Sequence, residues 1–178
     1  LGLYLSYRQA QAYEKSIIEN QVWVVRRNHY IDLGDYATKV NAPGNNVFDT
    51  LNAKEEGVKY EQELASFKGY VKTLRLEIEN EPNKLVRDEI VLRMDKVESS
   101  MEEMGKEAVL IFGFFNQNRD KEAGKRMATM DRKFAMLNQS IRELVNQIGD
   151  IQEDLFKQQK LEGERIRRFE YLIAGAIF

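Results

Sequence analysis

The sequence has 178 residues and contains no cysteine, one histidine and two prolines. Without cysteine, the chain can form neither disulfides nor cysteine-ligated metal sites. A single histidine excludes the carboxylate-bridged di-iron bundles, because these need a Glu-x-x-His motif on each of two helices. The scarcity of proline leaves long stretches in which a helix can continue without interruption.

The sequence also lacks the short motifs that carry common catalytic chemistry. It has no phosphate-binding glycine loop, no dinucleotide fingerprint and no nucleophile elbow. His29 would have to serve any Ser-His-acid triad, and the spacing suggests no grouping of all three residue types. We therefore expect no enzyme, no metal and no cofactor within these residues. The net charge is only −2, so we expect no nucleic-acid partner.

Hydrophobic residues recur at alternating spacings of three and four, which is typical of helices that pack along one narrow stripe. No segment alternates with period two, so we expect no sheet. Four stripes are visible. They are Ile18, Val22, Val25, His29, Leu33, Tyr36 and Val40; Tyr60, Leu64, Phe67, Val71, Leu74 and Ile78; Ile90, Met94, Val97, Met101, Met104, Ala108, Ile111 and Phe115; and Met127, Met130, Phe134, Leu137, Ile141, Leu144, Ile148, Ile151 and Leu155.

Turn and capping residues separate these stripes. The segment 41–46 reads Asn-Ala-Pro-Gly-Asn-Asn and predicts a turn. Asn52 and Asn83 are placed to cap the second and third helices, and Pro82 ends the second. The segment 116–120 separates the third helix from the fourth. The predicted helices are 1–41, 50–80, 84–116 and 119–178.

Short connections between consecutive helices favour antiparallel neighbours. The predicted fold class is therefore all-α, an antiparallel up-down-up-down four-helix bundle with long first and last helices. We expect residues 1–178 to form a single helical domain with both ends at the same pole. This arrangement brings the N-terminal and C-terminal segments together.

Both end segments are apolar. Residues 169–178 contain one charge, Glu170, and residues 1–7 contain none. We expect residues 1–7 and 169–178 to be the membrane-proximal ends of flanking transmembrane helices, with the chain part of a longer protein. The other interpretation is a helix tail buried against the first helix or a second subunit. The nearby Arg165, Arg167 and Arg168 favour the cytoplasmic side, but this rule is weak for a large translocated domain.

This architecture, together with the stretch Asn-Ala-Pro-Gly-Asn-Asn-Val-Phe-Asp at 41–49, resembles the all-helical extracytoplasmic sensor domains of bacterial transmembrane receptors. The stretch is similar to a turn in the sensor regions of membrane-bound histidine kinases. No kinase core, HAMP linker or methylation segment is present. The resemblance implies a periplasmic domain at the inner membrane, which passes a signal on as a small helix displacement, as a homodimer.

The densest cluster of polar and aromatic residues lies in the first helix. Its members form the candidate ligand site: Trp23, Arg26, Arg27, His29 and Tyr30. Two guanidinium groups beside aromatic rings suit a small anion such as a carboxylate. The alternative is a solvated helix face with an arginine stacked on Trp23. For His29 the alternatives are a core histidine bonded to Asp32 or across the bundle, a proton-sensing switch and a pocket wall.

The leading functional hypothesis is a ligand-sensing and signal-transmission module of a two-component sensor histidine kinase. A chemoreceptor sensor domain and a ligand-free structural bundle remain as alternatives, as does a cytoplasmic helical scaffold. The partners expected under the first hypothesis are a small molecule, a second copy of the chain and the membrane.

Overall fold

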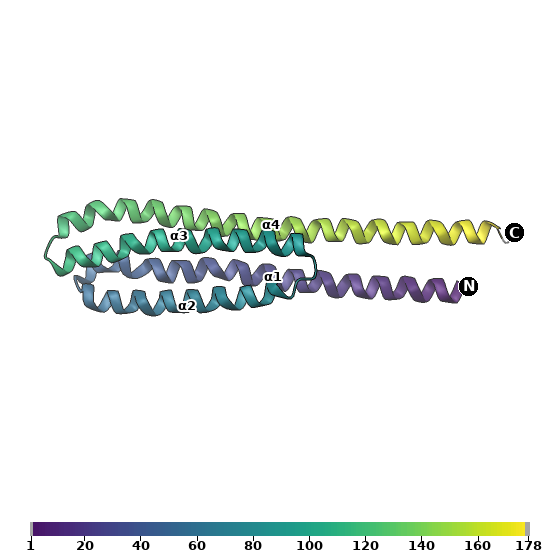
Figure 1. Cartoon of the computed structure of the whole chain (residues 1–178), viewed down its shortest axis with the longest axis horizontal. Coiled ribbons are helices and arrows are strands. Elements are labelled where there is room, and N and C mark those ends of the chain that lie inside the picture. The colour runs from purple at the N-terminus through teal and green to yellow at the C-terminus, as the bar shows by residue number, and fades with distance from the viewer. Residues whose placement is uncertain (1, 177–178) are drawn as a thin grey trace. The chain divides into compact units, whose positions relative to one another are not determined.

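The computed structural model describes residues 2–176, and describes side chains for residues 7–169, 171 and 172. This part of the chain is all-helical, with four helices and no strand: α1 (Gly2–Thr50), α2 (Ala53–Glu79), α3 (Lys84–Asn116) and α4 (Asp120–Ala176) (Figure 1). Within the described residues, no helix offers an apolar stretch sufficient to span a membrane. The predicted membrane-proximal ends, 1–7 and 169–178, fall largely outside the described side chains.

The chain divides into two compact units. Unit 1 combines residues 1–28 with 147–178, and unit 2 comprises residues 29–146. Unit 1 is thus built from the first part of α1 and the last part of α4. Unit 2 contains segments of all four helices, which lie side by side (Figure 1).

The apolar stripes predicted for α2, α3 and α4 form most of the core. All eight members of the α3 stripe are buried, and so are five of the six predicted on α2, where Leu64 alone is partly exposed. On α4, Leu137 and Leu144 are fully buried, whereas Met127, Phe134 and Leu155 are half-buried. These three stripes are confirmed.

The stripe predicted for α1 is wrong over its first half. Ile18, Val22 and Val25 are 55%, 44% and 51% exposed. The buried stripe of this helix instead comprises Trp23, Arg26, Tyr30, Leu33, Ala37, Val40, Gly44 and Val47, again at spacings of three and four. Both stripes have helical periodicity. The one with Trp23 and Tyr30 is buried because large aromatic side chains remove more apolar surface from water than valine does.

The predicted turn at 41–46 is also wrong, because α1 runs through it with Pro43 inside the helix. A proline in a helix interior costs about 3 kcal/mol. Burying Val40 and Val47, both 0% exposed, contributes roughly 3–6 kcal/mol together and offsets that cost. Gly44 serves close packing here, because a Cβ at this position would lie 2.7 Å from the Met130 sulfur.

The connection between α1 and α2 consists of Leu51 and Asn52 only. Leu51 has a φ of 52°, and its amide donates to the carbonyl of Val47 at 2.9 Å, which closes the helix with a left-handed residue. Asn52 caps α2 by accepting from the Glu55 amide at 3.2 Å. Asn83 likewise caps α3, accepting from the amides of Leu85 and Val86. Both predicted caps are confirmed.

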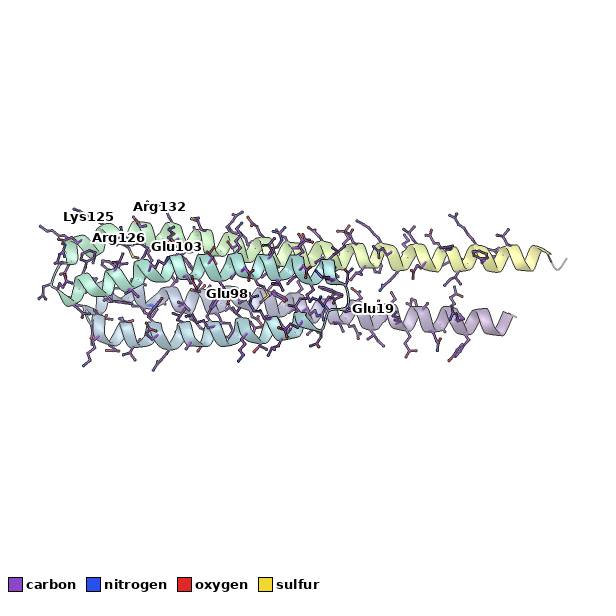
Figure 2. All side chains as sticks on the ribbon, in the orientation of Figure 1. Glu19, Glu98, Glu103, Lys125, Arg126 and Arg132 are labelled. Atoms are coloured by element: carbon purple, nitrogen blue, oxygen red, sulfur yellow. The ribbon has the colours of Figure 1, made fainter. Side chains whose placement is uncertain are left out.

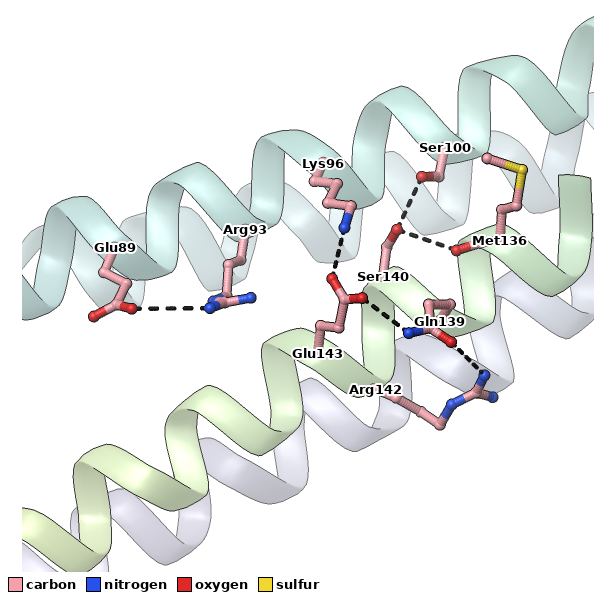
Figure 3. A network of polar contacts seen from close by, with 9 residues as sticks. All are labelled: Glu89, Arg93, Lys96, Ser100, Met136, Gln139, Ser140, Arg142 and Glu143. Atoms are coloured by element: carbon pink, nitrogen blue, oxygen red, sulfur yellow. Dashed lines mark hydrogen bonds and ion pairs between the residues drawn. The ribbon is translucent and has the colours of Figure 1, made fainter.

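Polar contacts, some of them buried, also connect α3 with α4. Lys96 donates to Glu143 at 2.6 Å, and the hydroxyl groups of Ser100 and Ser140 lie 3.0 Å apart (Figure 3). Farther along α3, Glu107 accepts from Arg126 at 2.7 Å. Figure 2 labels Arg126 on α4 and Glu103 on α3. Residues later in α3 therefore contact residues earlier in α4.

Candidate functional site

The five residues predicted as a ligand site fall into both units. Trp23, Arg26 and Arg27 belong to unit 1, and His29 and Tyr30 belong to unit 2. The two groups are therefore described separately. Their anion-binding role stays a prediction.

Trp23 and Arg26 are packed rather than open. Trp23 is 5% exposed and Arg26 is 9% exposed, with the guanidinium carbon 4.8 Å from the centre of the Trp23 ring. This cation–π contact is the geometry of the alternative interpretation, an arginine stacked on the indole. The cavity beside Trp23 has a volume of about 10 Å³, which is about the space of one water molecule.

Arg27 is the accessible cation of this group. Its side chain is exposed, and its guanidinium passes over Gly149 of α4, with Nε 3.8 Å from where a Cβ on that glycine would lie. The missing side chain at 149 gives the arginine stem a surface to lie on while the charged head stays in water. Of the two predicted arginines, Arg27 is the one placed to meet a dissolved anion.

Unit 1 also contains a polar seam between its two helical segments, which the sequence analysis did not predict. The Ser16 hydroxyl donates to Gln159, whose amide in turn donates to Glu19 at 2.8 Å. About two turns earlier on α4, the Gln152 amide donates to Asn20 at 2.9 Å. Glu19 is labelled in Figure 2. Positions 9, 12, 16 and 19 extend the spacing of the buried α1 stripe from Trp23 toward the N-terminus. None of them holds a large apolar residue, and this was the sequence signal for a polar seam.

In unit 2, His29 lies at the surface between α1 and α2 instead of in the core. Its side chain is 44% exposed, and Nδ1 is 3.1 Å from a carboxylate oxygen of Glu77. Of the predicted partners, the one across the bundle is therefore found. Tyr30 is 1% exposed, and its hydroxyl lies 3.8 Å from the sulfur of Met94. Tyr30 is a core residue.

A tyrosine of α2 organises the surroundings of His29. The Tyr70 hydroxyl donates to the His29 carbonyl at 2.9 Å and lies 3.3 Å from Asp32 Oδ2. Its ring stacks on Tyr36 with centroids 4.5 Å apart. Burial, followed by the negative charge of Asp32, raises the pKa of Tyr70 to about 12. Sequence spacing gave no sign of these contacts, because they join residues about 40 positions apart.

Within the part of the chain that the structure describes, no group of three or more His, Asp or Glu side chains is arranged to hold a metal ion.

Comparisons with protein-family models, with curated proteins and with solved structures found no match to this chain.

Proposed function

We propose that this chain is the extracytoplasmic ligand-sensing and signal-transmission module of a membrane-bound two-component sensor histidine kinase at the inner membrane. In this proposal, membrane-spanning helices flank the module, and the kinase chemistry resides outside residues 1–178. The observation that carries the proposal is the contrast between the polar seam of unit 1 and the apolar core of unit 2.

The polar seam suits a helix pair that shifts. Its hydrogen bonds, such as Gln152 to Asn20 and Gln159 to Glu19, each contribute about 1 kcal/mol net, because water can replace either partner. Sliding α4 against α1 at these residues breaks hydrogen bonds that water can replace. In unit 2, Leu33, Leu74 and Leu137 are each 1% exposed or less, so displacement there would cost far more. A signal is therefore best transmitted through unit 1.

The fold in this proposal is an antiparallel up-down-up-down bundle. Support comes from the paired residues between α3 and α4, where Lys96 meets Glu143 and Glu107 meets Arg126. The same opposite order holds between α1 and α4 within unit 1, where Ser16 meets Gln159 and Asn20 meets Gln152.

A homodimer through the long helices is part of the proposal. The first part of α1 exposes five large apolar side chains, each between 42% and 55% exposed: Ile17, Ile18, Val22, Val24 and Val25. A second copy of unit 1 would cover them by forming a four-helix arrangement. Sedimentation should show a dimer, and replacing Val22 and Val25 with glutamate should yield a monomer.

Ligand sensing is tested by measuring the melting temperature of the chain with a panel of small carboxylates, sulfate and phosphate. We expect at least one anion to raise it by several degrees, since a ligand that binds only the folded state stabilises it. Arg27→Ala should abolish the shift, whereas the matched control Lys68→Ala, an exposed lysine of unit 2, should preserve it. A panel without any shift would contradict anion sensing and favour the ligand-free structural bundle.

A further inference from the structure

The last part of α4 carries a concentration of positive charge in a chain that is acidic overall. Residues 157–172 contain five basic and three acidic residues, whereas the net charge of the whole chain is −2. The basic side chains at 160, 165, 167 and 168 are all exposed. We name this group the cationic segment: Lys160, Arg165, Arg167 and Arg168.

What sets the cationic segment apart is its density, because four basic residues without an ion-pair partner among the described side chains lie within nine positions of one helix. In unit 2, Lys59, Lys96 and Lys133 each pair with a glutamate within 3.3 Å. Among the side chains that the structure describes, none of the four members of the cationic segment has such a pair. Lys157, one turn earlier, is neutralised by Glu153 at 2.7 Å. Within the last part of α4, unpaired positive charge therefore begins after residue 157.

Exposed aromatic and aliphatic side chains follow the cationic segment directly. Phe169, Tyr171 and Leu172 are 54%, 71% and 70% exposed. Tyr171 follows Arg167 and Arg168 at helical spacings of four and three, so cation and aromatic ring share one side of α4. Amphipathic aromatic rings beside basic residues are typical of the headgroup layer of a membrane.

We propose that the cationic segment binds the headgroups of an anionic phospholipid surface. The phosphate groups meet the guanidinium groups of Arg165, Arg167 and Arg168 and the ammonium group of Lys160, while Tyr171 and Leu172 enter the headgroup layer. This inference rests on the proposed function, because it places this end of α4 at a membrane. A nucleic acid would satisfy the charges but leave the adjacent apolar side chains in water.

The consequence for signalling is that lipid charge holds the end of α4. Each basic residue near an anionic surface strengthens binding about fivefold, so three arginines together contribute about a hundredfold. Such an anchor resists displacement of α4 against α1 along the polar seam. The lipid composition then sets how easily the module responds.

The test is flotation of the chain with vesicles of pure phosphatidylcholine and of phosphatidylcholine with 30% phosphatidylglycerol. We expect binding to rise at least tenfold with the anionic lipid and to fall at high salt, because salt screens exposed charges. Arg165→Gln, Arg167→Gln and Arg168→Gln combined should lower it about a hundredfold. Replacing the same three arginines with lysine should retain most of the binding, and circular dichroism should show that both variants keep their helices.

The matched control removes three exposed positive charges from unit 2, through Lys68→Gln, Lys72→Gln and Lys121→Gln. We expect it to bind anionic vesicles as the parent does. Equal loss in both triple variants would overturn the proposal, because net charge alone would then explain binding. Equal binding to both vesicle types, stronger competition by free phosphate than by chloride at the same ionic strength, or tighter binding to a DNA duplex would also overturn it. None of these results depends on ligand sensing, so the two proposals can fail separately.

Discussion

The contact between Gly105 of α3 and Tyr60 of α2 permits a sharp test of how unit 2 is packed. A Cβ added at Gly105 would collide with the Tyr60 hydroxyl oxygen and would lie 3.5 Å from Cζ, the carbon that carries it. The Tyr60 ring is 4% exposed and packs against Phe112 with centroids 5.8 Å apart, so it has little room to retreat. Gly105→Ala is therefore opposed by one identifiable atom.

Two effects of opposite sign decide the outcome. Replacing a helix-interior glycine with alanine stabilises by about 1 kcal/mol, whereas overpacking a buried contact costs about 1–3 kcal/mol. We expect Gly105→Ala to lower the free energy of unfolding by up to about 2 kcal/mol in the wild-type background. In the Tyr60→Phe background the nearest remaining atom is at an ordinary contact distance, so the same substitution should stabilise by about 1 kcal/mol.

The assay is denaturant unfolding of the four proteins in this double-mutant cycle. Gly113→Ala on the same helix is the control, because nothing lies within 4 Å of its added Cβ, and it should stabilise equally in both backgrounds. If Gly105→Ala has the same effect in both backgrounds, within about 0.5 kcal/mol, the packing of Tyr60 on Gly105 is refuted.

Three further predictions concern stability. Leu51→Gly should raise the free energy of unfolding by about 0.5–1 kcal/mol, because Leu51 is 68% exposed and has positive φ; unchanged thermal stability would contradict this strain. Asn83→Ala should lower the free energy of unfolding by about 1 kcal/mol, because the α3 cap is lost, and Asn83→Asp should restore the stability. Burial raises the pKa of Tyr60 from 10 to about 12. The neutral Tyr60 side chain therefore makes its full contribution to the free energy of unfolding below pH 10, and this contribution is lost as the pH rises to 12. Across this pH range, the free energy of unfolding should fall by about 2 kcal/mol less in Tyr60→Phe than in the wild type. An equal fall in both proteins would contradict the raised pKa of Tyr60.

The sequence predicted the helices well wherever local signals and packing agreed. The α3 stripe from Ile90 to Phe115 and the caps Asn52 and Asn83 appear in the structure as expected. The turn at 41–46 failed because burial of Val40 and Val47 outweighs the local preference of Pro43. The true end of α1, at Thr50 just before Leu51, carried no signal, because leucine rarely takes positive φ.

The candidate site was harder to predict than the fold. Helical spacing correctly placed Arg26 against Trp23, since such pairs are set by the helix itself. It could not place His29, because two stripes of α1 had the same periodicity and only the packing partners decide between them. The contacts of His29 with Glu77 and Tyr70 depend on how α2 lies against α1, which no local pattern encodes.

We propose that this module lies outside the cytoplasm, between two membrane-spanning helices. The most direct test is to introduce Lys121→Cys, an exposed position in a segment without native cysteine, into the complete gene product in living cells. The protein without the substitution is the control. We predict that a membrane-impermeant maleimide labels this cysteine in intact cells, and that the labelled protein sediments with the membrane fraction. Labelling only after the cells are permeabilised would contradict the claim.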